Sequence, residues 1–166
     1  STREFVERAI RLKEVLTPYG VPLIINDRVD VALAANADGV HVGQSDMPYE
    51  MVKRLLPEGK IIGLSVESPE QVLEANNYDL DYVAASPVFS TTTKTNTIVE
   101  WGLDGLRWIR SVSRHPLVAI GGIHSNNVAS ICKAGADSVA VISAIVSADD
   151  PERAARELLE KSGEPH

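Results

Sequence analysis

Short apolar segments recur along this chain at a nearly constant spacing, and that spacing restricts its fold more than any other feature. The segments begin near residues 22, 39, 61, 82, 117 and 138. Most steps are about 20 residues long, which leaves room for one helix between successive strands. Strands that alternate with helices indicate a parallel sheet, and so regular a period favours a β/α barrel over a doubly wound sheet. We therefore expect an α/β fold of the (β/α)8 TIM-barrel type.

The clearest repeating unit begins at the apolar run 117–120, which ends at Gly121-Gly122. Apolar side chains then recur at helical spacing, and we expect Ser125 to cap this helix. A second buried strand is expected over residues 138–142. Continuous apolar strands joined by one helix are typical of a β-α-β unit whose sheet is covered on both faces.

The other elements are expected from the same periodicities and from their flanking residues. Helices are expected over residues 2–16, 29–35, 48–56, 69–75, 103–112 and 151–161, and strands over residues 21–25, 39–42, 60–66 and 82–85. The expected N-caps are Thr2, Ser68 and either Asp149 or Asp150.

A weak internal repeat supports this organisation. Residues 36–42 resemble residues 135–141, and residues 77–83 are a looser copy. In each copy a helix ends, an aspartate turn follows and a buried strand begins. The repeat indicates that successive β/α units are built alike.

The chain offers six strands, whereas a closed barrel of this type has eight and seldom fewer than about 200 residues. Its first expected element is a helix with no strand before it. At this spacing, two strands and one helix, about 40 to 50 residues, would precede residue 1. We expect residues 1–166 to form a single TIM-barrel domain that lacks these elements. Open strand edges predict a bound partner, either the chain's own N-terminal segment or a second copy in a homo-oligomer.

Composition restricts the classes of partner. With a formal net charge of −7, the chain presents no basic field for nucleic acid. Its longest apolar runs are too short for a membrane span. Cys132 is the only cysteine, which fits a reducing cytoplasm and a structural role. We therefore expect a cytoplasmic protein that acts on small molecules, with neither nucleic acid nor membrane as partner.

The active site of a β/α barrel lies at the carboxyl ends of its strands. The polar residues expected at these ends are Asn26, Asp27, Asp46, Ser65, Thr91, Thr93, Lys94, Gly122 and Ser143. They include two carboxylates, one ammonium, several hydroxyls and glycine amides. No Ser-His-Asp or Cys-His arrangement is visible, and His41 is interpreted as a packed barrel residue.

Asp27 and Asp46 follow neighbouring strands and could share one hard cation. Magnesium is held by one or two carboxylates, with water and substrate phosphate completing its shell, so two carboxylates suffice. The alternative is that each aspartate only caps the helix after it, Asp46 especially because it precedes Pro48. Spacing alone leaves both interpretations open.

Gly122 and Ser143 follow adjacent strands near the end of the expected barrel, where paired turns commonly form a phosphate site. The alternative is that Gly121-Gly122 only makes a tight turn. The threonine-rich loop 86–97 contains a single lysine, Lys94, and this combination suits binding of an anionic oxygen cluster. The alternative interpretation is that the loop is only a solvated, mobile segment.

The resemblance to a known family is carried by PLIINDRVDVALAANADGVHVGQSDMP, IIGLSV, SPVFSTTTK, VAIGGI and VISAI. Together these motifs, in this order and over essentially the whole chain, resemble the thiamine phosphate synthase family. The resemblance implies a TIM barrel that joins a hydroxymethylpyrimidine pyrophosphate to a thiazole phosphate and releases pyrophosphate, with Mg²⁺ as cofactor.

The resemblance also implies individual roles. Asn26 would contact the pyrimidine, Asp27 and Asp46 would hold magnesium, and Ser65 and Lys94 would bind the pyrimidine substrate and serve catalysis. The thiazole phosphate would be held by Thr91, Thr92, Thr93, Gly122, Ile142 and Ser143. The family's Gln-x-Arg-x-Lys stretch, which grips the pyrophosphate, would fall before residue 1.

Two alternatives remain open at this point. One is a thiazole tautomerase of the same fold, against which Asp27, Asp46 and Lys94 argue, because that reaction needs no magnesium-pyrophosphate site. The other is a phosphate-binding fragment that retains a ligand without turnover.

Overall fold

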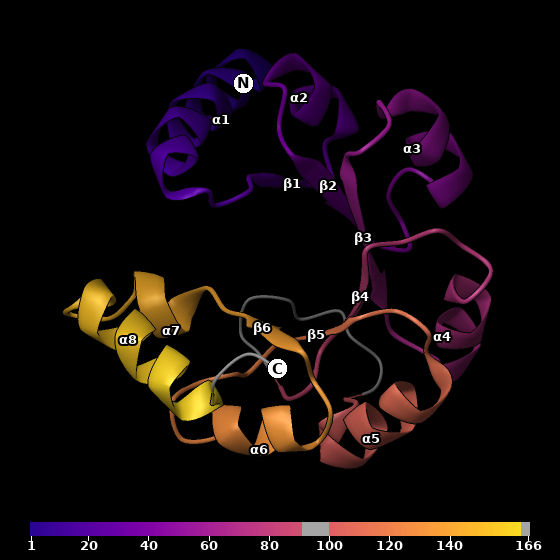
Figure 1. Ribbon diagram of the computed structural model, residues 1–166, viewed down its shortest axis with the longest axis vertical. Coiled ribbons are helices and arrows are strands. Elements are labelled where there is room, and N and C mark those ends of the chain that lie inside the picture. Colours follow the sequence, from indigo (N-terminus) through magenta and orange to yellow (C-terminus); the bar gives the residue numbers. More distant parts are fainter. Residues whose placement is uncertain (91–99, 164–166) are drawn as a thin grey trace. The chain divides into compact units, whose positions relative to one another are not determined.

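The computed structural model describes residues 1–90 and 100–163 (Figure 1). The chain divides into two compact units. Unit 1 comprises Ser1–Ser65 and Tyr78–Asp81, and unit 2 comprises Val66–Asn77 and Tyr82–His166.

Unit 1 is a run of helices and parallel strands. Its elements are α1 (Thr2–Leu16), the 3-10 turn η1 (Thr17–Tyr19), β1 (Ile24–Asn26), α2 (Val29–Ala34), β2 (Gly39–Val42), α3 (Tyr49–Leu55) and β3 (Ile61–Val66). Strand β1 pairs in parallel with β2, and β2 pairs in parallel with β3. Helix α1 packs against α2.

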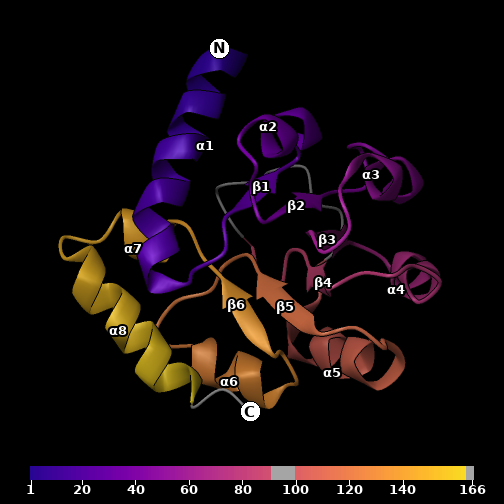
Figure 2. The ribbon, with the colours of Figure 1, turned by 45° about the horizontal axis from the view of Figure 1, so that its top comes forward.

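Unit 2 repeats the same alternation. Its elements are α4 (Pro69–Ala75), β4 (Tyr82–Ala85), α5 (Gly102–Val112), β5 (Leu117–Ile120), α6 (Val128–Lys133), β6 (Ser138–Ala140), α7 (Ser143–Val146) and α8 (Pro151–Ser162). Strands β4, β5 and β6 pair in parallel and lie side by side in Figure 2. Within the described ranges, all six predicted strands are present, which confirms the α/β class.

Burial explains why the strands are continuously apolar. Five of the six residues of β3 are buried, as are three of the four in β4, because side chains on both faces of these strands are covered. The helices bury only one face, through residues such as Val31, Val72 and Ile131, each fully buried.

The predicted aspartate turns act as clamps at the amino ends of the strands. Each aspartate accepts the backbone N–H of a residue at the start of the preceding strand, and its own N–H donates to the carbonyl of that same residue. The carboxylate-to-amide distances are 2.8 Å for Asp38 with Leu23, 2.7 Å for Asp81 with Ile62 and 2.7 Å for Asp137 with Leu117. The returning bonds are 2.9, 3.0 and 2.8 Å. The internal repeat in the sequence therefore corresponds to a clamp of two hydrogen bonds that recurs in the structure.

Two of the expected caps are wrong. Ser1, not Thr2, caps α1, because the Ser1 hydroxyl accepts from the Glu4 amide while the Glu4 carboxylate accepts from the Ser1 amine. Asn127, not Ser125, precedes α6. The caps at Ser68 and, of the two alternatives, Asp150 are confirmed.

Three strands are shorter than predicted, β3 by one residue and β1 and β6 by two residues each. Strand β1 begins at Ile24 rather than at residue 21, because the Val21 amide still donates to Leu16 in the turn that ends the first helix. Strand β6 ends at Ala140 rather than at residue 142, because the chain turns into the short helix α7 at Ser143.

Candidate functional site

The first group of predicted site residues lies at the carboxyl ends of the strands in unit 1. Asn26 is the last residue of β1 and is in register with His41 of β2. Asp27 follows, and its amide donates to the His41 carbonyl at 2.8 Å. The backbone of Asp27 is therefore fixed beside the end of the neighbouring strand.

Asp27 has an unusual backbone conformation. Its φ is 64°, in the left-handed region that only glycine adopts freely, and the Arg28 amide donates to the Asn26 carbonyl across it at 2.7 Å. A non-glycine residue in such a turn costs roughly 1–3 kcal/mol and is found most often at functional sites. Arg28, not Asp27, is the N-cap of α2, so capping does not explain the aspartate.

Asp46 is held in a small ring at the end of β2. Its Oδ2 accepts the Gly43 amide at 2.7 Å, and a Cβ at Gly43 would lie 3.0 Å from the same oxygen. The N-cap of α3 is Pro48, with no side-chain cap bond. The interpretation of Asp46 as a helix cap is therefore wrong: its carboxylate closes the turn after β2 and remains half-buried there.

Ser65, in β3, is buried and hydrogen-bonded from two sides. Its Oγ lies 2.9 Å from His41 Nε2, and its carbonyl accepts the Gln44 side-chain amide at 2.6 Å. From the sequence, Ser65 was predicted as a site residue, whereas His41 was interpreted only as a packed barrel residue. His41 pairs with Gly63, two residues before Ser65, so strand register was the signal that could have placed both side chains on one face.

The nearby cation Arg28 is already engaged. Its Nε and Nη2 donate to the two carboxylate oxygens of Asp30 at 2.8 and 2.6 Å. This bidentate bond lowers the pKa of Asp30 to about 2. The cation next to Asp27 is therefore paired with another carboxylate.

The donor set of unit 1 fits a cation that needs few protein ligands. Across residues 1–90 and 100–163, no group of three or more His, Cys, Asp or Glu side chains gathers in the manner of a complete metal cage. Asp27 and Asp46 offer hard oxygen donors at the ends of adjacent strands. Magnesium is commonly bound in this way, by one or two carboxylates with water and substrate phosphate.

The second group lies in unit 2, where Gly122 and Ser143 line one pocket of about 650 Å³ together with Phe89, His124 and Asn127. This confirms that the turns after β5 and β6 face a common space. Ile142 is the residue before α7 and is 57% exposed beside this pocket's Ser143.

Gly121 and Gly122 are required by packing as well as by backbone conformation. Their φ values are 100° and 65°. An added Cβ would lie 2.7 Å from Pro87 Cβ at the first position and 2.8 Å from Phe89 Cβ at the second. Both residues therefore form a tight turn in which conformation and packing require glycine, and Gly122 also lines the pocket.

The remaining predicted site residues, Thr91, Thr92, Thr93 and Lys94, lie outside the described residues. The structure therefore places Asn26, Asp27, Asp46 and Ser65 at or near the carboxyl ends of strands in unit 1, and it brings Gly122 and Ser143 together at the pocket of unit 2.

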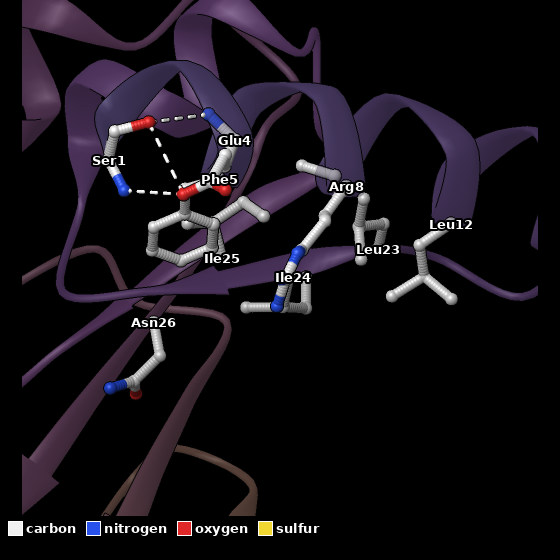
Figure 3. A pocket seen from close by; sticks show the side chains of 10 residues that line it. Ser1, Glu4, Phe5, Arg8, Leu12, Leu23, Ile24, Ile25 and Asn26 are labelled. Carbon is white, nitrogen blue, oxygen red and sulfur yellow. Dashed lines mark hydrogen bonds and ion pairs between the residues drawn. The ribbon is translucent and has the colours of Figure 1, made fainter.

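An apolar groove of about 630 Å³ runs between α1 and β1 (Figure 3). Phe5 and Leu12 of the helix and Ile24 and Asn26 of the strand are among the residues that line it. The sequence did not predict this groove. Apart from Asn26, it contains none of the predicted site residues.

None of the helices in the described part of the chain combines the length and the apolar character that a membrane crossing requires.

Comparison with known proteins identifies the relatives of this chain. The sequence model of the thiamine monophosphate synthase family matches residues 1–145. A thiamine-phosphate synthase of Albidiferax ferrireducens is 52% identical over 95% of this chain and 72% of its own length, and one of Vibrio parahaemolyticus is 50% identical over 95% and 77%.

A solved structure agrees with these sequence relatives. The thiamine phosphate pyrophosphorylase of Pyrococcus furiosus is 42% identical and superposes with a TM-score of 0.90 over 98% of this chain and 77% of its own. The fold predicted from strand spacing is therefore that of a solved relative. The chain belongs to the thiamine monophosphate synthase family.

Proposed function

We propose that the chain performs the reaction for which its relatives are named, the joining of a hydroxymethylpyrimidine pyrophosphate to a thiazole phosphate. The products are thiamine phosphate and pyrophosphate, which makes the protein a transferase of thiamine biosynthesis. The observation that carries the proposal is the placement of Asp27 and Asp46 at the ends of adjacent, register-paired strands in unit 1. Relatives about half identical in sequence support it.

The reaction breaks the bond between the pyrimidine CH2 and the pyrophosphate oxygen, and pyrophosphate leaves with the bonding electron pair. The thiazole nitrogen lone pair then forms the new C–N bond. No protein nucleophile is needed, because the pyrimidine amino group can stabilise the developing positive charge. The protein must neutralise the leaving group and hold the two reactants in line.

Asp27 and Asp46 would hold Mg²⁺, which supplies charge neutralisation on the pyrophosphate when it is bound. The bond to His41 fixes the backbone of Asp27, and the bond from the Gly43 amide orients the carboxylate of Asp46 before substrate arrives. Asn26, at the end of β1, would contact the pyrimidine.

Ser65 and Lys94 would donate to the pyrophosphate oxygens. His41 Nε2, 2.9 Å from the Ser65 hydroxyl, fixes the orientation of that hydroxyl. Lys94 would add an ammonium charge from the threonine-rich loop, and that role rests on the sequence. Both donors act on charge that increases as the C–O bond breaks, so they stabilise the transition state more than the bound substrate.

The thiazole phosphate would bind in the pocket of unit 2, at Gly122 and Ser143, flanked by Ile142 and by Thr91, Thr92 and Thr93 of the loop. Glycine at residue 122 lets backbone approach a phosphate closely. Anchoring the phosphate there would leave the thiazole ring nitrogen free to attack.

The test measures thiamine phosphate and pyrophosphate after incubation of the protein with both substrates and Mg²⁺. We expect the two products in equal amounts, and neither product when either substrate is omitted. Isomerisation of a thiazole phosphate supplied alone, without pyrophosphate release in the complete mixture, would contradict the proposal and indicate a tautomerase. Binding of thiazole phosphate without either product would indicate a binding protein.

A further inference from the structure

Asn127 joins the two ends of the turn that carries Gly122. Its Nδ2 donates to the Gly122 carbonyl at 2.9 Å, and its Oδ1 accepts the His124 amide at 2.9 Å. The same nitrogen lies 3.2 Å from His124 Nε2. One half-buried side chain thus fixes the backbone on both sides of Ile123.

These bonds are not explained by helix capping. Asn127 occupies the N-cap position of α6, yet its side chain makes no cap bond to the helix and is directed back to residues 122 and 124. Helix α6 begins with backbone bonds from Val128 to His124 and from Ile131 to Asn127, which do not involve this side chain.

The turn that Asn127 fixes forms one wall of the unit 2 pocket. Gly122, Ile123, His124 and Asn127 all line that pocket. Among the described residues, the amides of Gly122 and Ile123 donate to no protein acceptor, so they are available to a ligand. Their positions depend on a left-handed turn at Gly122, which a side-chain bridge can hold in one conformation.

We propose that Asn127 is a positioning residue for the thiazole phosphate: it holds the turn 122–124 in the conformation that presents backbone amides to the phosphate group. This inference rests on the proposed function, in which that phosphate binds at Gly122 and Ser143. In this role Asn127 does not bind the phosphate itself. It supports the turn that binds the phosphate and thereby determines the affinity for the thiazole phosphate.

The experiment compares steady-state kinetics of Asn127→Ala with those of the wild-type protein. Loss of the two bridging hydrogen bonds is expected to raise KM for the thiazole phosphate about tenfold. KM for the pyrimidine pyrophosphate and kcat at saturation should change less than about twofold, because pre-organisation of the turn affects binding of one substrate only.

Asn126→Ala is the matched control. Asn126 is the neighbouring asparagine, is exposed, and contributes only its backbone amide to the turn. This variant removes an identical side chain at the adjacent residue, and it should keep the wild-type KM values for both substrates. Asn127→Ser provides a second variant if Asn127→Ala does not fold, because serine is a good N-cap residue but is too short to bridge Gly122 and His124.

Ser143→Asp separates the inference from the proposed function. A carboxylate at residue 143 would repel a phosphate in the pocket, and it would be favourable in the first turn of a helix. If Ser143→Asp leaves KM for the thiazole phosphate unchanged, the phosphate does not bind at Gly122 and Ser143, and the role of Asn127 fails with that placement. The proposed function fails only if the wild-type protein forms neither product. If Ser143→Asp raises this KM while Asn127→Ala and Asn127→Ser behave as Asn126→Ala does, only the role of Asn127 is overturned. Equal increases in both KM values would also overturn it.

Discussion

At the scale of single residues, the backbone conformation of Asp27 supports its proposed role in binding the cation. A left-handed aspartate is strained, and its amide is bonded to the neighbouring strand at His41. Glycine would occupy this turn with less strain. The strained aspartate is therefore consistent with the proposed role of its carboxylate.

Replacement of Asp27 by glycine should therefore separate stability from activity. Asp27→Gly removes the strain of the left-handed turn, so we expect unfolding free energy to be unchanged or up to about 1 kcal/mol higher. Loss of the carboxylate should lower kcat roughly 100-fold or more. Urea unfolding and pyrophosphate release measure the two effects.

Asp27→Ala is the control for this variant, because it removes the same carboxylate but keeps a Cβ in the strained turn. It should be as inactive as Asp27→Gly and less stable. Full turnover in either variant would contradict the role of Asp27, and a glycine variant several kcal/mol less stable than wild type would contradict the account of strain.

At the scale of elements, residues at the amino ends of the strands stabilise the fold, whereas residues at the carboxyl ends have proposed roles in the reaction. The amino ends of the strands carry the clamps of Asp38, Asp81 and Asp137, and the carboxyl ends carry Asp27 and Asp46. The hydrogen bond from the Leu23 amide lowers the pKa of the Asp38 carboxyl group, and the bond from Lys13 lowers it further. The stabilising negative charge is therefore lost as the pH falls through this lowered pKa.

Asp137→Ala tests this separation. The change leaves the Leu117 amide without its carboxylate acceptor and removes the ion pair to Arg110. We expect a loss of about 1–3 kcal/mol in unfolding free energy, with KM and kcat unchanged at a temperature where the variant is folded. The control is Asp104→Ala, which removes an exposed carboxylate paired only within helix α5 and should leave stability nearly unchanged. A loss of activity without a loss of stability in Asp137→Ala would contradict the structural role.

The sequence was sufficient to predict the six strands and the longer helices, although not the short helix α7, because strand burial and helix periodicity are local patterns. It predicted β2 and β4 to the residue, and it brought Gly122 and Ser143 together correctly. It missed the bridge made by Asn127 and the bond between His41 and Ser65, because both depend on the direction of a side chain in space. It left open whether Asp46 caps the helix after it, and the N-cap at Pro48 and the Gly43 bond exclude that role.

At the scale of the whole molecule, the two compact units carry different parts of the proposed chemistry. Unit 1 holds Asn26, Asp27, Asp46 and Ser65, which would bind the pyrimidine pyrophosphate with its cation. Unit 2 holds Gly122 and Ser143, which would bind the thiazole phosphate. Substitutions at Asn26 or Ser65 should therefore change the affinity for the pyrimidine substrate only, and substitutions at Gly122 or Ser143 the affinity for the thiazole phosphate only.

The most direct test of the account is whether Asp46 helps to bind a divalent cation with pyrophosphate. Manganese, which accepts the same oxygen ligands as magnesium and is visible by electron paramagnetic resonance, can be titrated in the presence of inorganic pyrophosphate. The titration compares the wild-type protein with Asp46→Asn and with the control Asp104→Asn. We expect affinity to fall at least about tenfold in Asp46→Asn and to stay unchanged in the control. Equal manganese affinity in the wild-type protein and Asp46→Asn would contradict the account.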